Sequence, residues 1–412
     1  MECPACSAKC YCGSGNGAAV AGLSSENVYI REQFGIPEDR KKTKALFVMA
    51  IVAVLIATLW PFNPFPRNGV TWLRGTSGLK FQQPALVIGN GPLKPLAAQG
   101  AESYTLEILL RPAGIRSVHT ILAFYTSTRP HQFLVRQWRD GLVVTHNAAV
   151  ESDRSRKIKF DVDHVFHPGK LILVTISSGT KGTTVFLDGQ PVQSFPDFRI
   201  SRDELLGEIV LGTSPTSFLP WSGQLCGLAI YSKELTPADA MLHYEQWTGP
   251  GGRPPDLNGA IARYAFAEAA GNKVHNEVAS EPDLEIPATF LVPHKSLLQS
   301  APSEFKADWK YLSDVLTNIA GFVPLGLIVC AYFAWTKSRW KAILMTTVFC
   351  GMFSFVIEVL QYYIPRRGSG TTDIITNTLG AALGAGLMQT GAVRHVLEEM
   401  RLISRVPQCS RK

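Results

Sequence analysis

Two similar segments near the carboxyl end of the chain place acids and amides at helical spacing. They are residues 314–321 (DVLTNIAG) and 373–380 (DIITNTLG), which share Asp, Thr, Asn and Gly at the same positions. In each segment the Asp lies four residues before the Asn, so the carboxylate and the amide share one face of a helix. Such a face can hold a polar head group or a partner helix through hydrogen bonds.

A third segment adds Glu358 and Gln361, three residues apart, followed by Arg366 and Arg367. A charged side chain within an apolar helix costs on the order of 3 kcal/mol on insertion scales, so Glu358 should face other helices or a wet cavity. We expect one of the two arginines to pair with Glu358 or Asp373, because guanidinium groups form charge-assisted bonds with carboxylates. The predicted binding site comprises Asp314, Asn318, Glu358, Gln361, Arg366, Arg367, Asp373 and Asn377.

The same residue types also allow other interpretations. Asp314 and Asp373 are placed where they could cap helix N-termini, the two Asn could bridge helices, and Glu358 could lock a helix bundle through an Arg. An enzyme could use Glu358 and Asp373 as acid and base on a lipid-linked head group. A third alternative is a scaffold without catalysis, in which the helices only anchor the chain.

The composition indicates which elements carry these residues. Of the 412 residues 46% are apolar and 18% are charged, less than the roughly 25% charged residues of soluble domains. This balance predicts membrane-spanning segments beside a water-soluble domain. Four apolar segments are long enough to be considered as spans, at residues 45–62, 315–335, 342–362 and 374–388.

Basic residues cluster on one side of these four segments, which predicts the orientation of the chain. By the positive-inside rule both termini are cytoplasmic, the middle of the chain is extracytoplasmic, and the membrane is the inner membrane of a bacterium. Arg366 and Arg367 then fall outside, against the rule. The clusters are Arg40, Lys41, Lys42 and Lys44; Lys337, Arg339 and Lys341; and Arg394, Arg401, Arg405, Arg411 and Lys412.

The domain organisation follows from these segments. We expect a multi-domain membrane protein in which a four-helix transmembrane bundle is combined with an all-β jelly-roll sandwich. The expected parts are a cytoplasmic tail at 1–44, a first span at 45–62, an extracytoplasmic domain at 67–290, a linker at 291–312, three further spans at 313–390 and a cytoplasmic tail at 391–412.

The extracytoplasmic part alternates short apolar runs with turn residues, which is typical of a β-sandwich. Asp140-Gly141 and Asp188-Gly189 lie at the ends of such runs, where residues that tolerate positive φ form tight hairpin turns. A late run at residues 262–266 (ARYAF) predicts a strand that completes the sandwich out of chain order.

This part resembles the concanavalin A-like, laminin-G-type jelly rolls. The residues that carry the resemblance are 78–81 (GLKF), 104–108 (YTLEI), 185–189 (VFLDG), 221–224 (WSGQ) and 228–231 (LAIY). The resemblance implies binding of a glycan, often through an exposed aromatic ring. Trp138, Trp221 and Trp247 are the candidates, and packing in the core is the competing role for each.

Some members of that superfamily are glycosidases with alternating acids on one strand, a pattern that Glu281, Asp283 and Glu285 match. Pro282 lies among them and cannot donate to a strand ladder, so we interpret this segment as a surface edge or turn.

The membrane part resembles the VanZ-like family, which is associated with teicoplanin-type glycopeptide resistance. The pattern is D-x3-N-x2-G-F-x-P-x-G from Asp314, followed by E-x2-Q-x3-P-x-R-x5-D-x3-N-x2-G-x3-G from Glu358. The first span with its Trp60-Pro61-Phe62 end is also similar to the opening helix of the family. The resemblance implies that the jelly roll is inserted between the first and second helices.

No cofactor is expected, since the chain has no Gly-rich phosphate loop, nucleophile elbow or His-Glu-x-x-His motif. Cys3, Cys6, Cys10 and Cys12 could bind a metal, but their spacing matches no zinc site, so no metal is predicted. We expect membrane lipid and an envelope glycan or glycan-linked ligand as partners. Nucleic acid is not expected, because the net charge of +7 is modest.

Overall fold

The computed structural model describes residues 38–93, 102–115, 118–148, 156–249, 255–278 and 282–399. The cysteines at 3, 6, 10 and 12 and Glu281 lie outside these ranges. The chain divides into two compact units. The sandwich unit comprises Leu55–Val315 and Met352–Thr376, and the helical unit comprises Leu316–Gly351 with the described residues before 55 and after 376.

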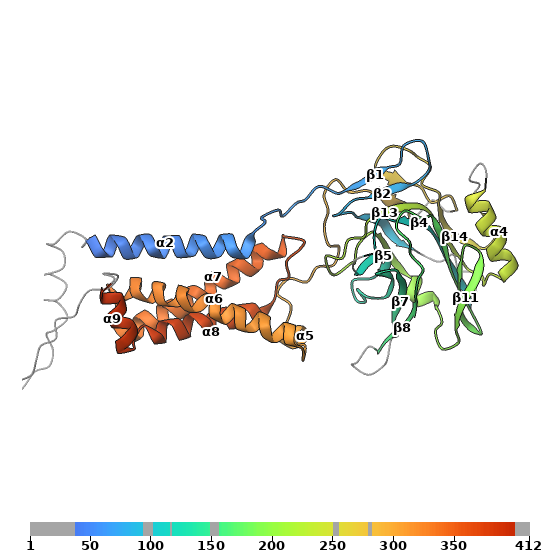
Figure 1. The fold of residues 1–412 in the computed structure, drawn as a ribbon. Coiled ribbons are helices and arrows are strands. Elements are labelled where there is room, and N and C mark those ends of the chain that lie inside the picture. Colours follow the sequence, from blue (N-terminus) through green and yellow to red (C-terminus); the bar gives the residue numbers. More distant parts are fainter. Residues whose placement is uncertain are drawn as a thin grey trace, which may run out of the picture. The chain divides into compact units, whose positions relative to one another are not determined.

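The sandwich consists of two sheets of eight strands each, and all neighbouring strands are antiparallel (Figure 1). In the first sheet the order is β1-β2-β13-β4-β9-β10-β11, with β14 paired to β13. Its strands are β1 (Val70–Trp72), β2 (Leu79–Phe81), β4 (Tyr104–Pro112), β9 (Ile172–Gly179), β10 (Gly182–Leu187), β11 (Gln190–Phe195), β13 (Gly223–Tyr231) and β14 (Ala260–Tyr264).

In the second sheet the order is β15-β16-β3-β12-β5-β6-β7-β8. Its strands are β3 (Val87–Leu93), β5 (Val118–Tyr125), β6 (Phe133–Trp138), β7 (Gly141–Ala148), β8 (Arg156–Val162), β12 (Gly207–Leu211), β15 (Lys273–Val274) and β16 (Leu284–Glu285). Side chains alternate between the two faces of each strand. The inward sets of both sheets form one apolar core, which includes Phe124, Phe133 and Trp221.

The late strands complete the sandwich out of chain order, as the sequence predicts. β14 pairs with β13, and β16 pairs with β3 of the other sheet. Pro282 precedes the two-residue strand β16, and the acids beside it have local partners. Asp283 Oδ1 accepts the Asn276 N–H at 3.2 Å, and Glu285 lies 4.0 Å from Lys273 Nζ. These contacts agree with the surface interpretation of Asp283 and Glu285.

One of the two predicted hairpin turns is confirmed, and the other is wrong by one residue. Asp188 and Gly189 join β10 to β11 with φ values of 51° and 78°. In the other hairpin Trp138 pairs with Gly141, so the turn residues are Arg139 and Asp140, and Arg139 has the positive φ of 55°. Gly141 is instead the first ladder residue, where an added Cβ would lie 3.2 Å from the Val162 carbonyl oxygen.

The helix α4 (Pro237–Thr248) covers part of the outer face of the first sheet; the short α3 is Arg202–Leu205. Beneath α4 lies a buried acid, Glu107 of β4. Its Oε1 is 2.9 Å from His243 Nδ1, and its Oε2 accepts the Trp247 indole N–H at 3.0 Å. Trp247, which is 7% exposed, is therefore a packing residue between α4 and the sheet.

We expect Glu107→Ala to lower the free energy of unfolding by about 1–3 kcal/mol, because it leaves the His243 and Trp247 donors buried without an acceptor. Thermal unfolding of the detergent-solubilised protein, followed by tryptophan fluorescence, measures the effect. Glu102→Ala, at an exposed acid on the segment before β4, is the matched control. Equal melting temperatures for both variants would contradict the prediction.

Three of the described helices are long and apolar enough to cross a membrane: Arg40–Leu59, Trp309–Ala334 and Arg339–Tyr362. They belong to α2 (Glu38–Leu59), α6 (Trp309–Ala334) and α7 (Arg339–Tyr362). The expected fourth span corresponds to α8 (Thr371–Leu387), which has 17 residues. The described part of the chain also contains two short helices, α5 (Ala301–Glu304) and α9 (Gly391–Glu399).

In the helical unit, glycines bring α6 and α8 into backbone contact. A Cβ at Gly380 would lie 2.3 Å from the Ile319 carbonyl oxygen, and one at Gly384 would lie 2.1 Å from the Val323 carbonyl oxygen. No side chain fits at either position, so the predicted small-residue packing of Gly380-x3-Gly384 is confirmed. Phe47 of α2 stacks on Tyr332 of α6, with ring centroids 4.8 Å apart.

Gly380→Val and Gly384→Val should each separate α6 from α8 and lower the melting temperature of the purified protein. Overpacking of this kind costs about 1–3 kcal/mol. Gly386→Val provides a matched control on the same helix, because nothing lies within 4 Å of a Cβ at Gly386. The packing argument fails if all three variants lose the same stability.

Candidate functional site

The predicted membrane-proximal site is divided between the two units. Asn318 and Asn377 belong to the helical unit. The sandwich unit holds the other six residues: Asp314, Glu358, Gln361, Arg366, Arg367 and Asp373. Within that unit the contacts of these side chains can be followed one by one.

Glu358 is a cap for the N-terminus of α8. The residue is only 1% exposed, and its Oε2 accepts the Gly370 N–H at 2.8 Å. Glu304 accepts the next free donor, the Thr372 N–H, at 3.0 Å, while the Gln299 carbonyl accepts the Thr371 N–H at 2.9 Å. The first N–H groups of a helix lack intrahelical partners and attract negative charge, so two carboxylates and a carbonyl stabilise this end.

Arg366 and Arg367 do not pair with Glu358, so the expected ion pair with this acid is not formed. Arg367 Nη2 donates to the Trp60 carbonyl at 3.0 Å, directly after α2, and the Arg366 guanidinium lies 5.0 Å from the centre of the Phe218 ring. Glu358 Oε2 instead accepts the backbone N–H of Gly370. The last carbonyls of a helix lack intrahelical donors, so the cation of Arg367 stabilises the C-terminal end of α2.

Gln361 and Lys295 satisfy carbonyls in the same way. Gln361 Nε2 donates to the Thr58 carbonyl at 3.0 Å, in the last turn of α2. Lys295 Nζ donates to the carbonyls of Gln361, Tyr362 and Ile364 at 2.9, 2.6 and 2.7 Å, where α7 ends. Burial lowers the pKa of Lys295 to about 8. All three ammonium hydrogens are used, so Lys295 has none left for a ligand.

Asp314 does not cap a helix, contrary to the alternative considered above. Asp314 is exposed in the second turn of α6, and the cap of that helix is Asp308, whose Oδ1 accepts the Tyr311 N–H at 2.7 Å. Asp373 is the third residue of α8. The sequence offered no signal for Lys295, Gln299 and Glu304, because they lie in the segment expected to be a linker.

The outer face of the second sheet carries a different kind of site. Trp138 is 53% exposed there, whereas Trp221 is only 1% exposed and donates its indole N–H to Gln137 in the core. Trp138 lines a hollow of about 360 Å³. The lining residues come from β5, β6, β7 and β8: Val118, Arg136, Trp138, Val143, Thr145 and Lys159.

Strand register places these side chains on one face. Arg136 pairs with Val143, and Thr145 pairs with Lys159. Arg136 Nε is buried and has no hydrogen-bond partner among the described residues, and burial lowers the pKa of this guanidinium. An aromatic ring beside two cations can hold a ligand with an apolar face and oxygen acceptors.

Comparison with protein-family models identifies both parts of the chain. Residues 264–392 match the VanZ/LLP1 family, and residues 89–241 match the concanavalin A-like lectin/glucanases superfamily. The chain combines a VanZ-like domain with a concanavalin A-like domain. The VanZ-like match contains all eight predicted site residues and also Lys295, Gln299 and Glu304.

Solved structures are similar to this chain at low identity. A candidate carbohydrate-binding protein from Bacteroides ovatus ATCC 8483 is 13% identical over 50% of this chain and 61% of its own, with a TM-score of 0.34. The CBM40 of the Ruminococcus gnavus IT-sialidase is 16% identical over 40% of this chain and 96% of its own, with a TM-score of 0.31.

A receptor-binding domain of botulinum neurotoxin C/D mosaic serotype is 17% identical over 43% of this chain, with a TM-score of 0.35. This chain spans 45% of that domain and thus less than two thirds of it. The comparison with curated proteins gives no match.

The VanZ-like contacts predict how Glu358 responds to substitution. Glu358→Ala should lower the melting temperature, because the buried Gly370 N–H loses its acceptor at a cost of about 1–3 kcal/mol. Glu358→Gln should retain most of the stability, since the amide oxygen can still accept this bond. Thermal unfolding in detergent compares both with Asp314→Asn, which changes an exposed acid. A Glu358→Ala protein as stable as the parent would exclude the capping role.

Proposed function

We propose that the chain is a cell-envelope membrane protein that binds an envelope glycan on the outer face of its concanavalin A-like domain. The exposed indole of Trp138 is the observation that carries this proposal. A pyranose ring presents an apolar C–H face that can lie on such a ring, and its hydroxyls can accept hydrogen bonds from Arg136 and Lys159. The hollow has a volume of about 360 Å³, within the range of small-molecule sites.

In this proposal the VanZ-like helices anchor the domain. Four spans with both termini in the cytoplasm of a bacterium would place the sandwich outside the inner membrane. The basic residues Lys337, Arg339 and Lys341 beside the α6–α7 connection support this orientation, as does the basic segment before residue 45. The 17 residues of α8 correspond to about 26 Å of helix, close to the thickness of the hydrocarbon core.

The polar residues of the VanZ-like part support an anchoring role in preference to catalysis. Glu358 accepts a backbone N–H, and Gln361 and Arg367 donate to backbone carbonyls. An acid–base pair needs a carboxylate that is open to substrate, and the contact of Glu358 does not favour that role. Membrane lipid around the helices is the second partner in this proposal.

Trp138→Ala should weaken glycan binding about tenfold, the equivalent of roughly 1.4 kcal/mol. The test uses the full chain in nanodiscs on an array of bacterial envelope glycans. Trp138→Tyr keeps an aromatic ring and should retain most of the binding. Val192→Ala, at an exposed residue of β11, is the control for the sandwich. An array without any bound glycan, or a Trp138→Ala protein that binds normally, would refute the proposed function.

A further inference from the structure

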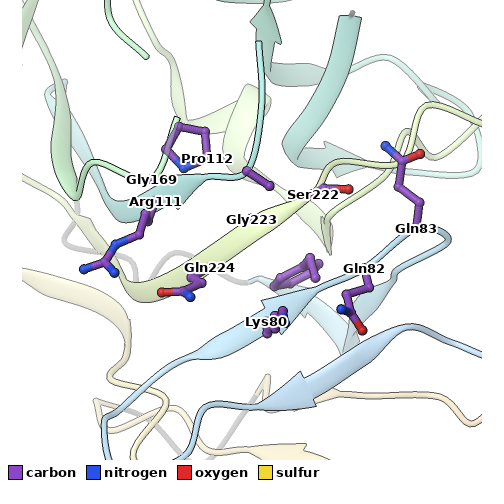
Figure 2. A pocket seen from close by; sticks show the side chains of 11 residues that line it. Lys80, Gln82, Gln83, Arg111, Pro112, Gly169, Ser222, Gly223 and Gln224 are labelled. Carbon is purple, nitrogen blue, oxygen red and sulfur yellow. The ribbon is translucent and has the colours of Figure 1, made fainter. Parts of the chain in front are cut away.

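A second hollow lies on the first sheet, away from Trp138. It has a volume of about 360 Å³ and is lined by residues of β2, β4 and β13, by residues that directly flank these strands, and by Gly169 (Figure 2). It shares no lining residue with the Trp138 hollow. We refer to it below as the first-sheet pocket.

Strand register brings three polar side chains together in this pocket. Gln224 of β13 pairs with Lys80 of β2 on one side and with Arg111 of β4 on the other. Their neighbours Leu79 and Leu225 point into the core, so the three polar side chains lie on the outer face. Figure 2 shows Arg111 and Gln224 projecting from adjacent strands toward the same side of the opening.

The pocket carries positive charge that the described residues do not neutralise. Neither Lys80 nor Arg111 forms an ion pair with a carboxylate in the part of the chain that the structure describes. Arg111 Nε is also buried there without a hydrogen-bond partner. A carboxylate bound at the guanidinium would supply a negative charge that the described residues do not provide.

We propose that the first-sheet pocket binds the carboxylate of an acidic saccharide. The guanidinium of Arg111 offers parallel N–H groups that match a carboxylate, and Lys80 adds a point charge on the other side of β13. The amides of Gln82 and Gln224 and the hydroxyl of Ser222 line the same pocket and can bond sugar hydroxyls. The site goes beyond the proposed function, because it does not involve Trp138.

The test is calorimetric titration of the full chain in detergent with digalacturonic acid and with glucuronic acid. Binding of one of these probes is expected, and its methyl ester, which lacks the charge, should bind at least about tenfold more weakly. Inorganic phosphate and glycerol 3-phosphate are titrated in parallel. If neither acid binds, if the ester binds equally well, or if a phosphate binds more tightly than either acid, the assignment is overturned.

Variants locate the site. Arg111→Gln and Lys80→Gln should each weaken binding of the acid about tenfold. Lys80 is exposed, so its replacement also tests the site if the Arg111 variant does not fold. Lys181→Gln removes an equal charge from an exposed turn of the same sheet and should leave binding unchanged. Equal loss in the Lys80 and Lys181 variants would show only a general charge effect and overturn the proposal.

Trp138→Ala separates this proposal from the proposed function. The variant should bind the acidic saccharide as the parent does, because the two hollows lie on different sheets. Loss of acid binding in Trp138→Ala, with Lys80→Gln unaffected, would assign the acid to the other hollow. If the array shows no bound glycan, calorimetric binding of an acidic saccharide would still support the first-sheet pocket.

Discussion

Backbone groups at helix ends need partners, and the polar residues of the VanZ-like domain are arranged around that requirement. An apolar environment offers no water to the last carbonyls or the first N–H groups of a helix. At the N-terminus of α8 the partners are carboxylates, Glu358 and Glu304. At the C-termini of α2 and α7 they are the cation or amide donors of Arg367, Gln361 and Lys295. Each charge has the sign that the helix dipole favours.

This arrangement accounts for residues that look like a binding or catalytic cluster. A buried Glu, a Gln one turn later and two Arg beyond it have the composition of a ligand site. In the sandwich unit, however, most of their hydrogen bonds go to backbone atoms. Glu358, Gln361 and Arg367 therefore satisfy backbone groups at helix ends.

The sandwich provides groups that could reach a ligand on its outer faces. Both sheets direct their apolar sets inward. The opposite faces are partly covered, by α4 on the first sheet and by Phe218, Phe290 and Val292 on the second. Two hollows remain on these faces, one with an exposed Trp and one with paired amides and cations. In both, an arginine Nε is buried without a partner among the described residues. Strand pairing sets the spacing of these groups in both hollows.

Much of the architecture could be predicted from local patterns. Alternation of apolar and polar residues is a property of neighbouring positions, so it indicated the β-sandwich and the late strand β14. Uncharged runs likewise indicated α2, α6 and α7, and the spacing of Gly380 and Gly384 indicated close helix contact. The hairpin at Arg139 was misplaced by one residue because Gly141 pairs with Trp138 in the ladder, and no local pattern records this strand register.

The sequence by itself thus determined the two domain types, the apolar helices and the residue types available for a site. Only the tertiary structure decided which of them meet. It placed Trp221 and Trp247 in packed interiors and left Trp138 exposed, although the three are the same residue type. It also brought Lys295 and Glu304 to helix ends more than sixty residues away in the chain. Burial and long-range contact depend on all neighbouring elements at once, and a linear pattern contains neither.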